Sequence, residues 1–271
     1  MFYCCYNVKH YTSRSVVRHL MSLMVEWRGT NASLGKNRLV LIALPGVGNI
    51  GKASLEALNS INNSAEIARL HHTALPPLAT LDDDGLLSPP HLSVNSIESL
   101  TGVNIITITG NSQPLEPQYQ GMMAREIMEF LNSQNVDTII VLAGMVDIAT
   151  RKEIFIVPSS SIFRIELEGL GADVRRDEPS SGAIGMAALL SSYGPLFGIN
   201  SACAIATTVG SSGDIHASQR ILEALDKWFG LGVALPKDAN EKLSAKLASM
   251  APKEVIDHYS ELTESPDAFY M

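Results

Sequence analysis

The sequence predicts an α/β fold, a three-layer αβα sandwich around a mostly parallel sheet, with further helices at the C-terminus. Three observations carry this prediction. Short, continuous apolar runs end in glycine, and helical patterns alternate with these runs along the chain. In addition, 46% of the 271 residues are hydrophobic and only 18% are charged, whereas about 25% is usual for globular domains. Such a composition favours a large core, an oligomer interface, or both.

Four apolar runs have the pattern of strands buried on both faces, because they are continuous and rich in β-branched residues. They are residues 38–44, 103–109, 137–143 and 201–209. Helical patterns at residues 53–61, 118–132 and 183–193 lie between them. This alternation predicts parallel strands with right-handed crossovers. Glycines at the strand ends would then line the carboxyl edge of the sheet, where open α/β sheets bind ligands.

We divide the chain into an N-terminal extension (1–37), an α/β core (38–235), C-terminal helices (236–262) and a flexible tail (263–271). The core ends in an amphipathic helix at residues 216–229. Residues 1–23 are interpreted as an upstream segment with Met24 as an alternative start, which the intact mass of natively expressed protein tests. No segment has the roughly 20 uninterrupted apolar residues of a transmembrane helix, and the N-terminus makes a poor signal peptide.

Charge and cysteine content exclude several classes. Acidic residues outnumber basic ones by 28 to 20, giving a net charge of −8, and such a surface repels nucleic acid. Cys4 and Cys5 are adjacent and Cys203 lies in an apolar run, so the three form neither a disulfide framework nor a metal pair. We expect Cys203 to be a small buried hydrophobe, the location to be cytoplasmic, and no metal or cofactor.

A glycine-rich loop, Leu44–Lys52, follows the first strand and precedes a helix. Its glycines fit the GxGxxG pattern of dinucleotide sites, and its Gly-Lys end suggests a phosphate-binding loop. Both patterns are incomplete. The next strand, near residues 66–70, ends in two histidines instead of a ribose-binding acid, and Ala53 stands where a magnesium-binding Ser or Thr is needed. We interpret the loop as a tight strand-to-helix turn that requires glycine.

Three other motifs have simpler structural explanations. Asp82–Gly85 could bind a hard cation, but a solvated hairpin turn is the commoner structure. His71 and His72 point to opposite sides of an extended strand and are interpreted as surface or interface histidines. The segment Gly210–His216 contains Ser, Asp and His, yet triad residues usually come from different strands. We expect Asp214 or a nearby serine to cap the following helix.

Four segments together resemble the archaeal proteasome assembly chaperone 2 family in order and spacing. They are Leu44–Lys52, Leu75–Pro77, Thr109–Pro114 and Leu142–Gly144. The resemblance covers residues 38–235. Its most distinctive part is Gly-Asn-Ser-Gln-Pro, in which Asn111 replaces the aspartate expected of the family.

The resemblance implies a fold like that of nucleoside phosphorylases or similar hydrolase-like sandwiches, without catalytic groups. It also implies a homo-oligomer whose partners are proteasome α-subunits, either during assembly of the α-ring or on the finished particle. The glycine loop then has a structural role.

The C-terminus, Phe269-Tyr270-Met271, has a hydrophobic residue, a tyrosine and any residue before the free carboxylate. This pattern is similar to the tails of proteasome activators and assembly chaperones, which insert into pockets between neighbouring α-subunits. The implied partner-binding residues are therefore Phe269, Tyr270 and Met271, tethered by residues 263–268.

The alternative is a nucleoside phosphorylase-like or nucleotide-binding enzyme that uses the strand-end cleft. Lys52 would contact phosphate, and Asn111, Ser112 and Gln113 would contact substrate. The possible cleft residues are Gly46, Gly48, Asn49, Gly51, Lys52, Gly110, Asn111, Ser112, Gln113 and Gly144. A third possibility is a structural scaffold without a functional tail.

Overall fold

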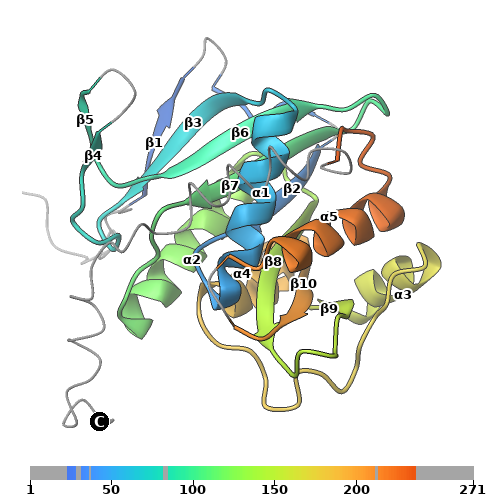
Figure 1. The fold of residues 1–271 in the computed structure, drawn as a ribbon. Helices are drawn as coiled ribbons and strands as arrows, with labels where there is room; N and C mark the ends of the chain where they lie inside the picture. The colour runs from blue at the N-terminus through green and yellow to red at the C-terminus, as the bar shows by residue number, and fades with distance from the viewer. Residues whose placement is uncertain (1–22, 29–31, 37, 82–84, 211–212, 236–271) are drawn as a thin grey trace, which may run out of the picture.

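The computed structural model describes residues 23–28, 32–36, 38–81, 85–210 and 213–235. Its middle layer is an eight-stranded sheet with the spatial order β1-β3-β6-β7-β2-β8-β10-β9 (Figure 1). The strands are β1 (Leu23–Trp27), β2 (Arg38–Ala43), β3 (Ala65–His72), β6 (Leu92–Glu98), β7 (Asn104–Gly110), β8 (Thr138–Val146), β9 (Ile154–Pro158) and β10 (Asn200–Thr208). The helices are α1 (Ile50–Ile61), α2 (Pro117–Ser133), α3 (Ser161–Gly169), α4 (Met186–Tyr193) and α5 (Ile215–Phe229), with short 3-10 turns at Val47–Asn49 and Gly194–Phe197.

The centre of the sheet is parallel, as the sequence predicts. β2 pairs in parallel with β7 and β8, and β8 pairs in parallel with β10. These are the four continuous apolar runs, and most of their residues are buried. Alternate side chains enter opposite layers: Val40 and Ile42 join one core cluster, and Leu39 and Leu41 the other.

Helices cover both faces of this centre, which confirms the three-layer sandwich. One cluster joins the sheet to Met123, Ile127 and Leu131 of α2 and to Leu190 of α4. The cluster on the other face contains buried side chains of α1, α3 and α5, for example Leu55, Leu167 and Leu225. In Figure 1, α1 and α5 lie in front of the sheet and α2 and α4 behind it.

Antiparallel strands extend the sheet at both edges. β3 and β1 continue it beyond β6 on one side, and β9 pairs with β10 on the other. Strands β1, β6 and β9 and helix α3 were not expected from the sequence, although Ile154–Pro158 is a clear β-branched run ended by proline. Strand β1 and the buried Leu34 lie within the predicted extension, so the packed sheet begins before residue 38.

Helix α5 begins one residue before the predicted residue 216 and ends at Phe229 as predicted. The Asp214 carboxylate caps it by accepting a hydrogen bond from the Ala217 N–H, and Gly230 ends it in the left-handed conformation. Helix α4 begins at Met186, later than the predicted residue 183, because Gly185 has a φ of 86°. The predicted helices within residues 236–262 and the tail lie outside the described residues.

Two smaller predictions are confirmed and one is wrong. The short strands β4 (Thr80–Leu81) and β5 (Leu87–Ser88) form the predicted hairpin, although Asp82–Asp84 lie outside the described residues. Cys203 is buried, and burial raises the pKa of its thiol to about 11. His72 is not a surface histidine: it is only 4% exposed, because its face of β3 is covered by α2.

Candidate functional site: the strand-end cleft

The glycine-rich loop makes a tight turn between β2 and α1. Gly48 has a φ of 62° inside the 3-10 turn, and Asn49 has a φ of 50° just before the helix. The Asn49 N–H donates to the Gly46 carbonyl at 2.9 Å, and the Gly213 N–H donates to the Gly48 carbonyl at 3.1 Å. The loop is therefore closed by its own backbone and tied to the segment before α5.

Two glycines allow α1 to pack directly on β8. A Cβ atom at Gly51 would lie 2.4 Å from the Leu142 carbonyl oxygen, and one at Gly144 would lie 2.3 Å from the Val47 carbonyl oxygen. Both distances are far below van der Waals contact. Close packing is a sufficient reason for glycine at both positions, and it supports the structural interpretation of the loop.

A cleft of about 640 Å³ opens beside this loop, between the end of β8, the start of α2 and the start of α4. Its walls are mainly apolar and include Leu44, Val47 and Met186. Its longer polar side chains already bond to the backbone: Gln113 Nε2 donates to the Pro45 carbonyl at 2.9 Å, and Gln120 Nε2 to the Pro114 carbonyl at 2.8 Å. A ligand in this cleft would therefore make mainly apolar contacts and few contacts with charged groups.

The structure divides the predicted cleft residues among several places. Gly46, Gly51, Gln113 and Gly144 line the 640 Å³ cleft. The residues Gly110, Asn111 and Ser112 line a separate hollow of about 100 Å³. Gly48, Asn49 and Lys52 line neither.

Lys52 forms an ion pair within helix α1. Its Nζ lies 2.6 Å from Glu56 Oε1, one turn along α1. A lysine that served a phosphate would need to point into the cleft, so the alternative role of Lys52 receives no support from this geometry.

The sheet order is a second argument against a dinucleotide site, in addition to the missing ribose-binding acid. β3, whose end the dinucleotide pattern would use, is separated from β2 by β6 and β7. At that end, His71 Nε2 lies 2.9 Å from Glu26 Oε2. This hydrogen bond is the largest influence that lowers the pKa of Glu26.

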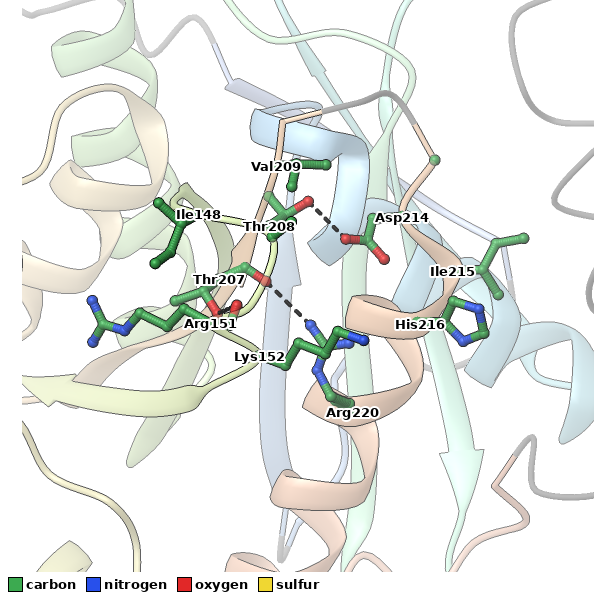
Figure 2. A pocket seen from close by; sticks show the side chains of 12 residues that line it. Ile148, Arg151, Lys152, Thr207, Thr208, Val209, Asp214, Ile215, His216 and Arg220 are labelled. Atoms are coloured by element: carbon green, nitrogen blue, oxygen red, sulfur yellow. Dashed lines mark hydrogen bonds between the residues drawn. The ribbon is translucent and has the colours of Figure 1, made fainter.

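The segment before α5 lines a second, more polar cavity (Figure 2). Thr208 Oγ1 donates to Asp214 Oδ2 at 2.7 Å, while Asp214 Oδ1 accepts from the Ala217 N–H at 2.9 Å. The hydrogen bonds of Asp214 thus serve the cap, as predicted, and do not orient His216. The basic residues of this cavity, Arg151, Lys152 and Arg220, were not expected as a group, because Arg220 lies far along the chain from the adjacent pair Arg151 and Lys152.

Within the described ranges, no cluster of three or more His, Cys, Asp or Glu side chains could hold a metal ion. No helix among the same residues is long and apolar enough to cross a membrane. The predicted partner-binding residues Phe269, Tyr270 and Met271 lie outside the part of the chain that the structure describes.

Comparisons with known proteins agree with one another. The family model described as "PAC2 family" matches residues 40–254. An uncharacterized protein of Methanocaldococcus jannaschii is 23% identical over 192 residues, which are 71% of this chain and 74% of that protein.

Two solved structures from Pyrococcus furiosus have a similar fold. PbaB, an archaeal proteasome activator, matches with a TM-score of 0.69 and 19% identity, covering 85% of this chain and 99% of that chain. PbaA, an archaeal homolog of proteasome-assembly chaperone, matches with a TM-score of 0.67 and 23% identity, covering 86% and 94%.

Proposed function

The chain belongs to the PAC2 family, and from this membership we propose that it is a proteasome assembly chaperone or a factor that binds the core particle. The observation that carries the proposal is the family match over residues 40–254. The similarity of the fold to a proteasome activator and to a homolog of proteasome-assembly chaperone supports it. The proposed partner is the ring of α-subunits in the cytoplasm.

The proposed contact is the C-terminal segment Phe269-Tyr270-Met271, inserted into pockets between neighbouring α-subunits. The terminal carboxylate can pair with a lysine of the pocket. The Tyr270 ring can fill apolar space while its hydroxyl bonds to the wall, and Phe269 buries further apolar area. Residues 263–268 are polar and contain a proline, so they suit a tether.

A single tail should bind weakly, since three residues bury little area and their ordering costs entropy. We infer that the protein is a homo-oligomer. Several tails on one particle raise the effective concentration at a ring and lengthen the lifetime of the complex. The low charge content and the exposed apolar side chains of the described surface are consistent with self-association.

We propose further that the protein is not an enzyme. Lys52 pairs with Glu56, Asp214 caps a helix, and the glycines of the loop serve close packing. The alternative is a nucleoside-binding enzyme that uses the 640 Å³ cleft, whose volume is in the range of small-molecule sites. A saturable rise in Tm with adenosine that is lost in Q113A would favour this alternative.

Co-purification with the α-ring of the source organism tests the docking proposal. We expect the full-length chain to bind the ring, and expect both the variant without residues 269–271 and Y270A to lose at least about 90% of binding. The loss should occur because the pocket contacts are all in the deleted segment. Size-exclusion chromatography with light scattering should show the same oligomer in every variant.

The matched control is Y119A, which removes an exposed tyrosine of α2 and should bind like the full-length chain. Undiminished binding by the truncated protein would defeat the tail mechanism while leaving a role on the proteasome intact. Failure of the full-length chain itself to bind would count against the proposed function as a whole.

A further inference from the structure

A second cavity, of about 540 Å³, lies where β10 ends and α5 begins. Three segments that are distant in the sequence form it: the β8–β9 connection near Ile148–Lys152, the end of β10 at Thr207–Val209, and residues 213–220. Figure 2 shows their side chains around the opening. This cavity is separate from the strand-end cleft, with which it shares no lining residue.

The charge of this cavity is opposite to that of the whole chain. Its lining contains three basic side chains, Arg151, Lys152 and Arg220, and one acidic side chain, Asp214. The chain as a whole has a net charge of −8. A locally basic cavity on an acidic protein concentrates anions at that place.

One of the three cations is already neutralised. Arg151 donates to Asp147, Glu153 and Glu178 at 2.8, 2.8 and 2.6 Å, and Figure 2 shows its guanidinium directed away from Asp214 and His216. Arg151 therefore holds the β8–β9 connection in place and is not available to a ligand.

The other two cations have no carboxylate partner within the described residues. No ion pair there involves Lys152 or Arg220. Arg220 Nη2 donates to the Thr207 carbonyl at 3.1 Å, but its Nε is buried without a hydrogen-bond partner. A buried donor with no acceptor is costly, so the hydrogen-bonding capacity of the Arg220 guanidinium is not fully used within the described residues.

Asp214 does not meet this donor, since no hydrogen bond or ion pair joins it to Arg220. Both of its carboxylate oxygens accept hydrogen bonds, from Thr208 Oγ1 and from the Ala217 N–H. Asp214 therefore caps α5 and offsets part of the charge of Arg220 through space, but it forms no ion pair with either Arg220 or Lys152.

The opening of the cavity is apolar. Ile148 is 68% exposed and Val209 is 53% exposed, although both are large aliphatic side chains. Both side chains line the cavity, and so does Ile215. A ligand that matches the whole lining has an anionic group for the cations and a compact apolar part for these side chains.

We propose that this cavity binds a small organic anion, a phosphate or carboxylate attached to a compact apolar group. The Arg220 guanidinium can hold two oxygens of the anionic group with its planar fork, and Lys152 adds a point charge at the rim. The apolar part lies on Ile148 and Val209. This site is independent of the C-terminal tail and therefore goes beyond the proposed docking function.

Binding of three related probes to the full-length protein tests the site. Phenyl phosphate and benzoate carry different anionic groups on the same ring, and benzamide is the neutral control. Isothermal titration calorimetry at constant ionic strength should show saturable binding of at least one anion and none of benzamide. The probe that binds more tightly identifies phosphate or carboxylate as the preferred group.

Variants locate the binding. We expect K152Q and R220Q each to raise the Kd by about tenfold or more, since a hydrogen-bonded charge is lost. D214N should lower the Kd several-fold, because asparagine remains a good N-cap while the negative charge is removed. K36Q, which removes an exposed lysine outside the cavity, should leave the Kd unchanged.

R220K is a second variant at this position, in case R220Q does not fold. It keeps the positive charge and removes only the planar guanidinium group. The proposal is overturned if neither anion binds saturably, if benzamide binds equally well, or if K152Q and R220K both bind like the unmodified chain. An increase in Kd for K36Q as large as that for K152Q would also overturn it, since the effect would then be one of net charge.

Discussion

Glycine is required at residues 51 and 144 because backbone carbonyl groups occupy the space of a side chain. The affected oxygens belong to Leu142 and Val47, so neither can swing aside as the end of a flexible side chain could. Relief would require α1 to move away from β8, and this would disturb the packing of Ile50 and Leu55 in the same core cluster. Tightly packed interiors resist such movement.

We therefore expect G51A to lower the free energy of unfolding by about 1–3 kcal/mol, the usual cost of overpacking. The matched control is G169A at the end of α3, where a Cβ would meet no atom within 4 Å. There the free energy of unfolding should stay unchanged or rise by up to about 1 kcal/mol, since alanine favours a helix. Urea unfolding followed by circular dichroism measures both. Equal effects of the two substitutions would contradict the packing argument.

At the scale of elements, β1 is joined to the body through α2 as well as through β3. The Leu23 N–H donates to Glu126 Oε2 at 2.7 Å, and the rings of Trp27 and Phe130 lie 6.2 Å apart. His72 of β3 completes this junction. Its Nδ1 accepts from the Ala74 N–H, and its Nε2 lies 3.5 Å from Glu126 Oε2.

This junction should make the stability of the protein depend on pH. Burial lowers the pKa of His72 below its usual 6.5, and the neighbouring Glu126 only partly offsets this. Because the folded protein then binds the proton more weakly than the unfolded chain, the contribution of His72 is present above about pH 6.5 and is lost as the pH falls through the folded-state value.

H72N keeps an oxygen that can accept from the Ala74 N–H but cannot be protonated. We expect the unmodified protein to be more stable than H72N at pH 7.5, and this difference to shrink as the pH falls to 5. Urea unfolding at several pH values measures the free energy of unfolding of both proteins. Subtracting one value from the other at each pH removes the contributions of the other titrating groups. Parallel stability curves for the two proteins would show that His72 does not titrate as proposed.

At the scale of the whole molecule, the described surface combines low charge with exposed apolar side chains. They occur at the β4–β5 hairpin, at Leu81 and Leu87, and on the outer face of α3, at Ile162 and Ile165. The hairpin projects from the body in Figure 1. A surface of this kind is consistent with a protein that works in an assembly, as the proposed docking of several tails requires.

Multiple tails lead to a quantitative expectation. A synthetic peptide of residues 263–271 should bind the α-ring at least about a hundredfold more weakly than the full-length protein, because it lacks the effective concentration that linked tails share. Surface plasmon resonance on immobilised α-rings measures both. Similar affinities for the peptide and the protein would show that one tail acts alone.

The sequence by itself determined the parallel centre of the sheet, the start of α5 and the family. Continuous β-branched runs identified β2, β7, β8 and β10, since strands that are buried on both faces cannot alternate with polar residues. Asp214 and the serines before an amphipathic pattern indicated a capped helix start, and the structure identifies Asp214 as the cap. A strand run and a helix cap each depend on residues that are close together in the sequence, so both can be predicted from the sequence alone.

Only the tertiary structure decided how distant segments meet. It placed β6 and β7 between β2 and β3, so that β3 does not lie beside β2 as a dinucleotide site would require. It turned Lys52 towards Glu56, separated Asn111 from the cleft, and brought Lys152 and Arg220 to one cavity. The physical reason is that local periodicity specifies which face of an element is buried, whereas the pairing of strand edges and the meeting of remote side chains depend on the packing of the whole chain.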